Sequence, residues 1–586
     1  MGFLRSFLAS CLGAFAALVL LLTLVFVVIS LSGGDEIIVK KDSILSLDLD
    51  APIVETEKEE PFTGLFLFGA SSPKTIGLAQ LLETIKHAEA DDNIAGIRLS
   101  ISYPMTGYAV LTEIRSALEA FRERGKWVVA YSEVMSEGAY YLASVADKVY
   151  LNPEGDVEFN GLSVEVSFFK RLFDKLEIKP EVFRVGEFKS AVEPFLLDRM
   201  SEANRSQLTA LIDDIYDNIL VSVARSRGLE VERLREISAA MLVREPQQSV
   251  EVGLVDSLLY DDEVERVLKN RLSLAEDEAL SYVSYEKYKR SFSTYNKSDN
   301  EIAVLVAEGT IMPGKSGQGE LVVGSETFVA QLRKLRERDK VKGVVIRINS
   351  PGGSSLASDV MWREITLTSA VKPVIASMSD YAASGGYYLA IGCDTIVAQP
   401  STVTGSIGVF SVLYDASGFL GNKIGITTDE VRTGEIGNLI TFSRPLTETE
   451  RNIWQKRTEA VYKSFTTKAA TSRGMALEDL LKVASGRVWS GAQARERGLV
   501  DVLGGLDEAI LVAAKAAGVE SNFGVRTYPQ YTPSLVEQLI DQLGAEQEAS
   551  LAKSQLGEYY EIINHVKEMR SLSGTQARLP YELRIR

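Results

Sequence analysis

Cysteine and histidine are the scarcest reactive residues of this chain of 586 residues, which has two of each: Cys11, Cys393, His87 and His565. A disulfide framework needs several cysteine pairs, and a structural zinc site needs about four Cys or His ligands, so the composition excludes both. A Ser-His-Asp enzyme is disfavoured for the same reason. We expect no metal and no cofactor, and we assign structural roles to both histidines.

Long blocks of one charge sign are also missing. The chain has 63 Lys and Arg against 80 Asp and Glu, a formal net charge of −17, without the basic footprint of a nucleic-acid-binding protein. Low-complexity stretches are few, and hydrophobic residues make up 46% of the chain, a globular proportion. We therefore expect no nucleic-acid partner, and several domain-sized units that fold over most of the length.

The first residues form a long apolar run. Residues 6–34 carry no charge, and residues 7–31 are almost wholly apolar, long enough to cross a hydrocarbon core of about 30 Å. A cleaved signal peptide has an apolar core of only about 7 to 15 residues. We predict a membrane anchor at 1–34 with one transmembrane helix. Basic residues lie on both sides of the run, so charge alone leaves its orientation open.

The body of the chain is an internal duplication. Residues 96–104 match 343–351, 137–143 match 384–390, and 253–256 match 498–501, at offsets of 343 − 96 = 247, 384 − 137 = 247 and 498 − 253 = 245. We predict two repeats, at 45–292 and 300–525, joined by a polar linker. A C-terminal tail follows at 526–586, and its pattern is helical and mostly polar from about Pro533.

Within each half, short β-rich runs alternate with helical patterns. In the second half, strands are predicted at 303–307, 344–348 and 374–376, and helices at 327–338 and 359–368. This alternation is typical of an α/β fold with a largely parallel sheet. Such folds place their chemistry in the turns that lead from strand ends into helices.

One such turn contains two adjacent glycines. Gly352 and Gly353 lie in the sequence Asn-Ser-Pro-Gly-Gly-Ser at 349–354, between a strand and a helical pattern. Without side chains, their backbone N–H groups can approach a ligand closely, as an oxyanion hole requires. The alternative is an ordinary glycine turn.

A second turn presents a serine. Ser384 follows the next predicted strand, between small residues that leave it accessible, and a helix starting there would add the N–H of Gly385 as an oxyanion donor. The alternative is a serine that caps the helix. The run is only a near match to the G-x-S-x-G elbow, because Ala382 replaces the first glycine.

A nucleophilic serine needs a base, and with so little histidine the candidates are lysine and carboxylates. A buried lysine qualifies because desolvation disfavours its charged form. Lys189 aligns with Gly437 of the other repeat (437 − 189 = 248), whereas Ser384 aligns with Glu137. The repeats have thus diverged in a complementary way: one keeps the candidate base and the other the nucleophile. The alternatives are drift and a solvated surface lysine.

Four segments together resemble the long form of signal peptide peptidase A (protease IV) of bacterial inner membranes: 188–195, 349–353, 384–390 and 404–409. The resemblance covers the anchor and both repeats. It implies that Ser384 is the nucleophile, Lys189 the general base and Ser406 a hydroxyl that orients the lysine. It also implies two tandem Clp protease/crotonase-like domains after the anchor.

The resemblance has further implications for setting and substrate. It implies a homotetramer whose sites face a hydrophobic interior on the periplasmic side of the bacterial inner membrane. Substrates would be hydrophobic peptides such as signal-peptide remnants, bound in extended conformation along a groove by β-augmentation, with Gly352, Gly353 and Gly385 around the oxyanion.

Two rival functions share parts of this pattern. Residues 309–316 match the phosphate-loop signature G-x-x-x-x-G-K-[ST], but a nucleotide site needs a helix from about Lys315, and the next convincing helix is predicted near Ser325. A crotonase-like acyl-CoA enzyme, or an inactive scaffold, would share the implied fold. The anchor and the serine favour peptide hydrolysis, because CoA chemistry normally uses soluble enzymes with carboxylate bases.

Overall fold

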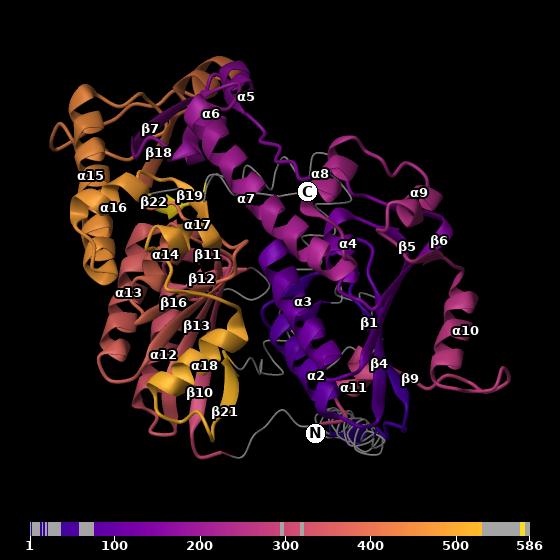
Figure 1. The fold of residues 1–586 in the computed structure, drawn as a ribbon. Coiled ribbons are helices and arrows are strands. Elements are labelled where there is room, and N and C mark those ends of the chain that lie inside the picture. Colours follow the sequence, from indigo (N-terminus) through magenta and orange to yellow (C-terminus); the bar gives the residue numbers. More distant parts are fainter. Residues whose placement is uncertain are drawn as a thin grey trace.

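A computed structural model of the chain describes residues 37–57, 75–292, 298–316, 321–529 and 575–579, besides a few isolated positions before residue 21. Two α/β halves lie side by side; in Figure 1 the first is coloured indigo to magenta and the second orange to yellow. Within the described ranges, no helix is both long and apolar enough to cross a membrane. The predicted anchor at 1–34 lies outside them, apart from those isolated positions.

The first half is built on a six-stranded parallel sheet with the order β8-β6-β5-β4-β1-β9. Its strands are β1 (Ser43–Asp48), β4 (Ile94–Ser100), β5 (Trp127–Met135), β6 (Lys148–Val157), β8 (Ser257–Leu258) and β9 (Tyr282–Ser284), with a short separate pair, β2 (Ile53–Val54) and β3 (Ile76–Gly77). Its helices are α2 (Leu78–Ala90), α3 (Tyr108–Glu123), α4 (Glu137–Ala143), α7 (Glu202–Arg227), α8 (Val231–Ala239), α9 (Pro246–Glu251), α10 (Asp261–Arg271) and α11 (Tyr285–Tyr288). This is the predicted α/β class.

The second half has an eight-stranded sheet with the path β19-β17-β15-β13-β10-β21, in which β16 also pairs with β15 and β20 pairs with β16. Its strands are β10 (Glu301–Glu308), β13 (Val341–Ser350), β15 (Val374–Ala383), β16 (Thr395–Ala398), β17 (Val403–Gly405), β19 (Val488–Ser490), β20 (Val502–Leu503) and β21 (Gly524–Tyr528). Its helices are α12 (Ser325–Glu337), α13 (Ser355–Ser369), α14 (Gly385–Ala390), α15 (Glu448–Arg473), α16 (Leu477–Val483), α17 (Gly491–Glu496) and α18 (Leu506–Ala516), with a π-helix η2 (Phe419–Lys423). The strands and helices predicted in this half fall on β10, β13, β15, α12 and α13.

The internal duplication is visible element by element. Helices α2 and α12 begin 325 − 78 = 247 residues apart, and strands β5 and β15 begin 374 − 127 = 247 residues apart. Helices α7 and α15 both span 26 residues, and their starts differ by 448 − 202 = 246. The offset found in the sequence is therefore also the offset of the folded elements.

A third sheet joins the two halves, with the order β12-β11-β14-β22-β18-β7. Its strands are β7 (Lys179–Val185), β11 (Thr310–Met312), β12 (Val322–Gly324), β14 (Gly352–Ser354), β18 (Val409–Asp415) and β22 (Thr575–Arg578). Strand β7 belongs to the first half, between α5 (Lys170–Leu176) and η1 (Ser190–Val192) with α6 (Glu193–Leu196), yet it pairs antiparallel with all of β18 (Figure 1). The chain after β7 is thereby brought against the second half.

The described part of the tail differs from our prediction. We expected helix from about Pro533 onward; residues 533–574 lie outside the described ranges, but 575–578 form the strand β22. This strand lies between β14 and β18 and is antiparallel to both. Pairing with two strand edges outweighs the local pattern, which carries no information about such distant partners.

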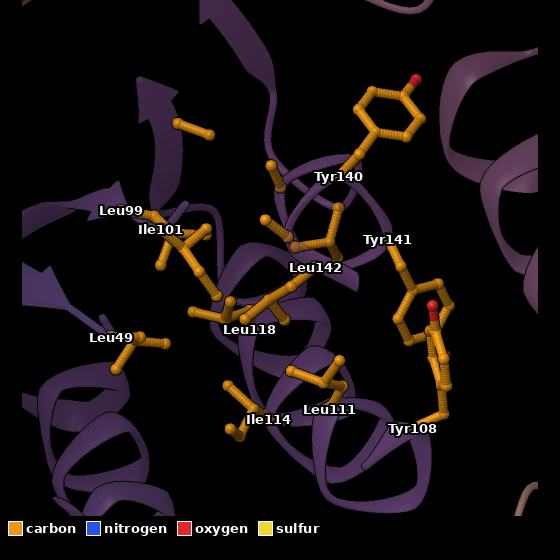
Figure 2. Packing of buried hydrophobic residues seen from close by; sticks show 14 of the residues in the cluster. Leu49, Leu99, Ile101, Tyr108, Leu111, Ile114, Leu118, Tyr140, Tyr141 and Leu142 are labelled. Atoms are coloured by element: carbon orange, nitrogen blue, oxygen red, sulfur yellow. The ribbon is translucent and has the colours of Figure 1, made fainter. Parts of the chain in front are cut away.

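The core of the first half packs α3 against the sheet. Leu111, Ile114 and Leu118, spaced as one face of a helix, point toward Leu99 and Ile101 at the end of β4 (Figure 2). The same cluster of buried side chains continues into the second half through Val403 and Val488. The two halves therefore share apolar contacts.

A buried ion network also links the halves. Arg347 of β13 is fully buried, and its guanidinium donates to Glu55 Oε2 at 2.8 Å and to Glu113 Oε1 at 2.7 Å, both in the first half. Burial opposes its charge, but the carboxylates of Glu113 and Glu55 outweigh burial and raise the pKa of Arg347. Asp380 adds a second link, because its carboxylate accepts the N–H groups of Gly107, Ala109 and Val110 at 2.8–3.1 Å.

Candidate active site

Ser384 lies where β15 ends and α14 begins, as the sequence predicts. Its backbone has φ 55° and ψ −108°, a conformation that L residues rarely adopt, and its N–H donates to the carbonyl of Gly405 at 2.8 Å. Ser384 occupies the N-cap position of α14, but its side chain makes no capping hydrogen bond, so its hydroxyl does not serve as a helix cap. Its hydroxyl is buried and donates to the carbonyl of Gly408 at 3.4 Å.

Lys189 reaches Ser384 from the first half of the same chain. It lies between β7 and η1, and its side chain is fully buried. Nζ donates to Ser384 Oγ at 2.9 Å, to Ser406 Oγ at 3.0 Å and to the Ser406 carbonyl at 3.2 Å. An ammonium has three protons for these three oxygens. A neutral amine has two protons and one lone pair, so it can accept the Ser384 proton and still hold Ser406.

Burial lowers the pKa of Lys189 well below the ordinary lysine value of 10.5, because the ammonium loses its hydration. The oxygens that hold Nζ come from serine hydroxyls and one carbonyl. Within the described ranges, no carboxylate is in hydrogen-bond contact with Nζ to restore the charged form. The neutral amine, the form that can take a proton, is therefore favoured.

Ser406 is held in place by its backbone. It follows β17 with φ 49°, and its N–H donates to the carbonyl of Arg487 at 2.7 Å. Two of its oxygens accept from the lysine amine, so Ser406 fixes where Nζ lies. This geometry suits the orienting role that the resemblance implies for Ser406.

Two glycines against Lys189 were not singled out from the sequence. Gly486 has φ 80°, and a Cβ on it would stand 2.7 Å from both the Cβ and the backbone N of Lys189. A Cβ on Gly408 would stand 3.2 Å from the Lys189 Cδ. Gly408 lies in the segment 404–409, one of the four that carry the family resemblance. The sequence around Gly486 shows only a Ser-Gly turn, which does not predict a contact with the lysine.

The three glycines predicted around the oxyanion meet beside Ser384. Gly352 has φ 100°, and a Cβ on it would stand 2.7 Å from the backbone N of Gly385. Its own N–H donates to Ser350 Oγ at 3.2 Å and is therefore not the free oxyanion donor that we expected. What Gly352 provides is the room that a side chain would fill. Gly353 lies in β14, where a Cβ would stand 2.0 Å from the carbonyl oxygen of Ile311. The N–H groups of Gly353 and Gly385 are therefore the better candidates for oxyanion donors.

The first half has different chemistry at the matching positions. Glu137 begins α4 where Ser384 precedes α14, and its Oε2 accepts the N–H groups of Asn160 and Gly161 at 3.0 and 2.7 Å. Burial raises the pKa of Glu137. Gly437, the counterpart of Lys189, lies exposed in the segment between η2 and α15. The serine and the lysine thus come together once, across the halves.

The phosphate-loop pattern does not have phosphate-loop geometry. Its residues follow β10 and run through β11, which pairs with β12 and β14. The next helix in the described part of the chain, α12, begins at Ser325, as predicted, rather than at Lys315. In the first turn of α12, the N–H of Glu326 donates to the carbonyl of Gly314 at 2.8 Å, so the loop's own backbone takes a donor that phosphate binding would need.

Comparison with known proteins gives one match in each half. The family model for Peptidase family S49 matches residues 120–275 and 366–520. "Protease 4" of Salmonella typhi is 35% identical over 528 residues, 87% of this chain and 84% of that protein. "Protease 4" of Haemophilus influenzae is 33% identical over 492 residues, 81% of this chain and 79% of that protein.

Two other comparisons extend beyond these bacteria. "Serine protease SPPA, chloroplastic" of Arabidopsis thaliana is 36% identical over 503 residues, 85% of this chain and 72% of that protein. A solved structure of a ClpP1 mutant from Listeria monocytogenes aligns at 17% identity and a TM-score of 0.24, with 35% of this chain and 94% of that chain covered.

Proposed function

The chain belongs to peptidase family S49 and is a serine peptidase, and from this premise we propose that it is an endopeptidase with a Ser384–Lys189 dyad that degrades hydrophobic peptides such as signal-peptide remnants. One observation carries the proposal: a fully buried lysine amine lies 2.9 Å from the hydroxyl of a serine with strained backbone geometry. A lysine that serves only structure would be expected to pair with a carboxylate.

Acylation uses the contacts already described. Neutral Lys189 accepts the Ser384 proton as Oγ attacks the peptide carbonyl, while the N–H groups of Gly353 and Gly385 hold the oxyanion. Lys189 then gives that proton to the leaving amine. Ser406 keeps Nζ aligned through both proton transfers. Water, deprotonated by the same amine, releases the acyl group and regenerates Ser384.

The setting of the enzyme is part of the proposal. The uncharged run at 6–34 supports an N-terminal anchor. The family resemblance supports the bacterial inner membrane, a catalytic body on the periplasmic side, a homotetramer and a Clp protease/crotonase-like fold in each half. The rival acyl-CoA enzyme would use a carboxylate base, and the group that holds Ser384 Oγ is an amine.

The test compares hydrolysis of a fluorogenic hydrophobic peptide by detergent-solubilised wild type, Ser384→Ala and Lys189→Met. We expect loss of turnover in Ser384→Ala and a decrease of about 10²- to 10⁴-fold in Lys189→Met. The matched controls are Ser369→Ala, whose hydroxyl bonds Asp394, and Lys372→Met, whose amine donates to backbone carbonyls and whose pKa burial also lowers. An acyl-enzyme trap should add its mass to Ser384. Full activity in either dyad variant would refute the proposal.

A further inference from the structure

One amide, that of Gln207 in α7, bonds both the loop 188–190, which carries Lys189, and the strand β19 of the second half. Gln207 is buried, and its Nε2 donates to the Phe188 carbonyl at 3.2 Å and to Ser190 Oγ at 3.0 Å. Its Oε1 accepts the N–H of Val488 at 3.3 Å. The residues on both sides of the lysine are thus bonded to one side chain, which also reaches the other half.

The groups around Gln207 require an amide at this position. A backbone carbonyl can only accept and a backbone N–H can only donate, so the Phe188 carbonyl places Nε2 and the Val488 N–H places Oε1. A third oxygen, Asn204 Oδ1, lies 3.0 Å from Nε2 on the same helix. An apolar side chain of the same size would supply neither the donor nor the acceptor.

Residues 485–488 contact both the base and the serine that orients it. The glycine of this segment lies against the backbone of Lys189, and the carbonyl of Arg487 accepts the N–H of Ser406 at 2.7 Å. Gln207 bonds the last residue of the segment. It therefore joins the loop that carries the lysine to the segment that holds Ser406.

Helix α7 is itself fixed on the second half along one face. Gln207, Ala210 and Asp214 are three and four residues apart, so they lie on the same side of the helix. The carbonyl of Ala210 accepts from Gln493 Nε2 at 2.9 Å, and the carboxylate of Asp214 accepts from Ser490 Oγ. These contacts give Gln207 a defined position relative to β19 and α17.

Comparison of the two copies links this amide to the lysine. Helices α7 and α15 start 246 residues apart, so Gln207 matches Ile453 (453 − 207 = 246). The copy that has Ile453 is also the copy in which an exposed Gly437 stands in the place of Lys189. The amide therefore occurs in the copy that has a lysine to position, and the copy without that lysine has an apolar residue instead.

We propose that Gln207 is a positioning residue for the base: its amide holds the loop 188–190 so that Lys189 Nζ stays against Ser384 and away from water. This inference rests on the proposed function. Without the amide, the carbonyl of Phe188 would lose a donor and the N–H of Val488 an acceptor, and water would have to replace both. Water admitted there would reach the lysine loop.

The test uses Gln207→Met in the full chain, a substitution that keeps the length of the side chain and removes the amide. We expect kcat for a fluorogenic hydrophobic peptide to fall about 10- to 100-fold because Nζ is displaced, and KM to stay near its wild-type value. The kinetic pKa, the pH at which kcat/KM is half-maximal, should rise, since water that reaches the Lys189 amine favours its charged form.

Two arginines lie against the loop 188–190, and both are the same in every variant. Arg184 donates to the Lys189 carbonyl at 3.5 Å, and the guanidinium of Arg487 lies 4.9 Å from the centre of the Phe188 ring. A change in the kinetic pKa therefore reports the hydration of the lysine amine rather than a new charge beside it.

Gln493→Met is the matched control. Gln493 also joins the halves, but its amide bonds the Ala210 carbonyl and caps α17 instead of holding the lysine loop. It should lower the melting temperature, as Gln207→Met does, but leave the kinetic pKa unchanged. Ser190→Ala removes one oxygen that Nε2 holds, so it should raise the kinetic pKa by less and add little to Gln207→Met. If Gln207→Met does not fold, Ser190→Ala takes its place in the test.

Amide hydrogen exchange locates the effect without using activity. In Gln207→Met, peptides that cover residues 186–192 and 485–490 should exchange faster than in wild type, because both segments lose a bond to the amide. A peptide that covers β13 should exchange at the wild-type rate. In Gln493→Met, residues 186–192 should also exchange at the wild-type rate.

The outcomes separate the two proposals. Ser384-dependent hydrolysis with wild-type kcat and kinetic pKa in folded Gln207→Met overturns this inference and leaves the proposed function standing. Equal shifts of the kinetic pKa in Gln207→Met and Gln493→Met overturn it as well, because the amide would then act only by joining the halves. Absence of hydrolysis in folded wild type overturns the proposed function. Unchanged exchange of residues 186–192 in Gln207→Met overturns the hold on the loop in either case.

Discussion

Lys189 Nζ and Ser384 Oγ lie 2.9 Å apart although 195 residues separate them in the chain and each belongs to a different repeat. The contact depends on β7, which leaves the first half to pair with β18 of the second. Each repeat holds one partner of the proposed dyad, and the matching positions of the other copy hold Gly437 and Glu137. The proposed site therefore needs both copies.

The pH dependence of activity should report the lysine. In the proposed mechanism the neutral amine is the base, so kcat/KM for a peptide substrate should rise with pH through the pKa of Lys189 and then level off. Burial lowers that pKa well below 10.5, so the plateau should be reached well before pH 10. A rate profile between pH 5 and 10.5 measures this, and a rate still climbing at its alkaline end would contradict the buried neutral amine.

The burial of Lys189 should also lower the stability of the fold, and this loss should become smaller as the pH rises. At a pH between its lowered pKa in the fold and its ordinary pKa, the lysine is protonated when unfolded and neutral in the fold, so folding releases a proton and stability rises with pH. The slope is up to about 1.4 kcal/mol per pH unit and ends near the ordinary lysine pKa of 10.5. Lys189→Met has no amine that must lose a proton on folding. We expect its melting temperature to lie above that of wild type at neutral pH, and the difference to become smaller toward pH 10. For Lys372→Met we expect a much smaller difference in melting temperature.

Ser406 should act on the lysine rather than on the substrate. Ser406→Ala removes one hydrogen-bond acceptor from Nζ, and with it part of the stabilisation of the charged amine, so the kinetic pKa should fall. Because Nζ is then held less firmly, kcat should also drop. KM should stay near its wild-type value, and Ser406→Thr should restore much of the activity. An unchanged pH profile in Ser406→Ala would assign the residue a purely structural role.

Gly486 should be needed for the position of Lys189. A methyl group in Gly486→Ala would meet the Lys189 backbone and Cβ at 2.7–2.8 Å, and turnover should fall as Nζ moves. Gly474→Ala is the matched control, since Gly474 also has a positive φ, 61°, but open space around it. It should lose only about 1–2 kcal/mol of stability and keep its activity. Equal effects of the two substitutions on turnover would contradict the steric account.

Arg347 should hold the halves together. Arg347→Met leaves Glu55 and Glu113 buried without their cation, which costs about 3–5 kcal/mol when one member of a buried ion network is removed. The thermal midpoint should fall, and activity should fall with it because the dyad spans the halves. Adding Glu55→Gln and Glu113→Gln should recover much of the midpoint. Failure of these two substitutions to recover any of it would argue against the ion network as the cause.

The sequence by itself determined the duplication, the α/β class and the placement of Ser384 in a strand-to-helix turn, because these depend on periodicity and on turn residues that are local in the chain. Comparison of the two copies singled out Lys189. The tertiary structure alone decided that Lys189 meets Ser384 and Ser406, that Gly486 lies against it, and that residues 575–578 form a strand rather than the predicted helix. These features depend on contacts between distant segments and on the burial of one amine, and the strand pairing and desolvation that produce them have no local signature.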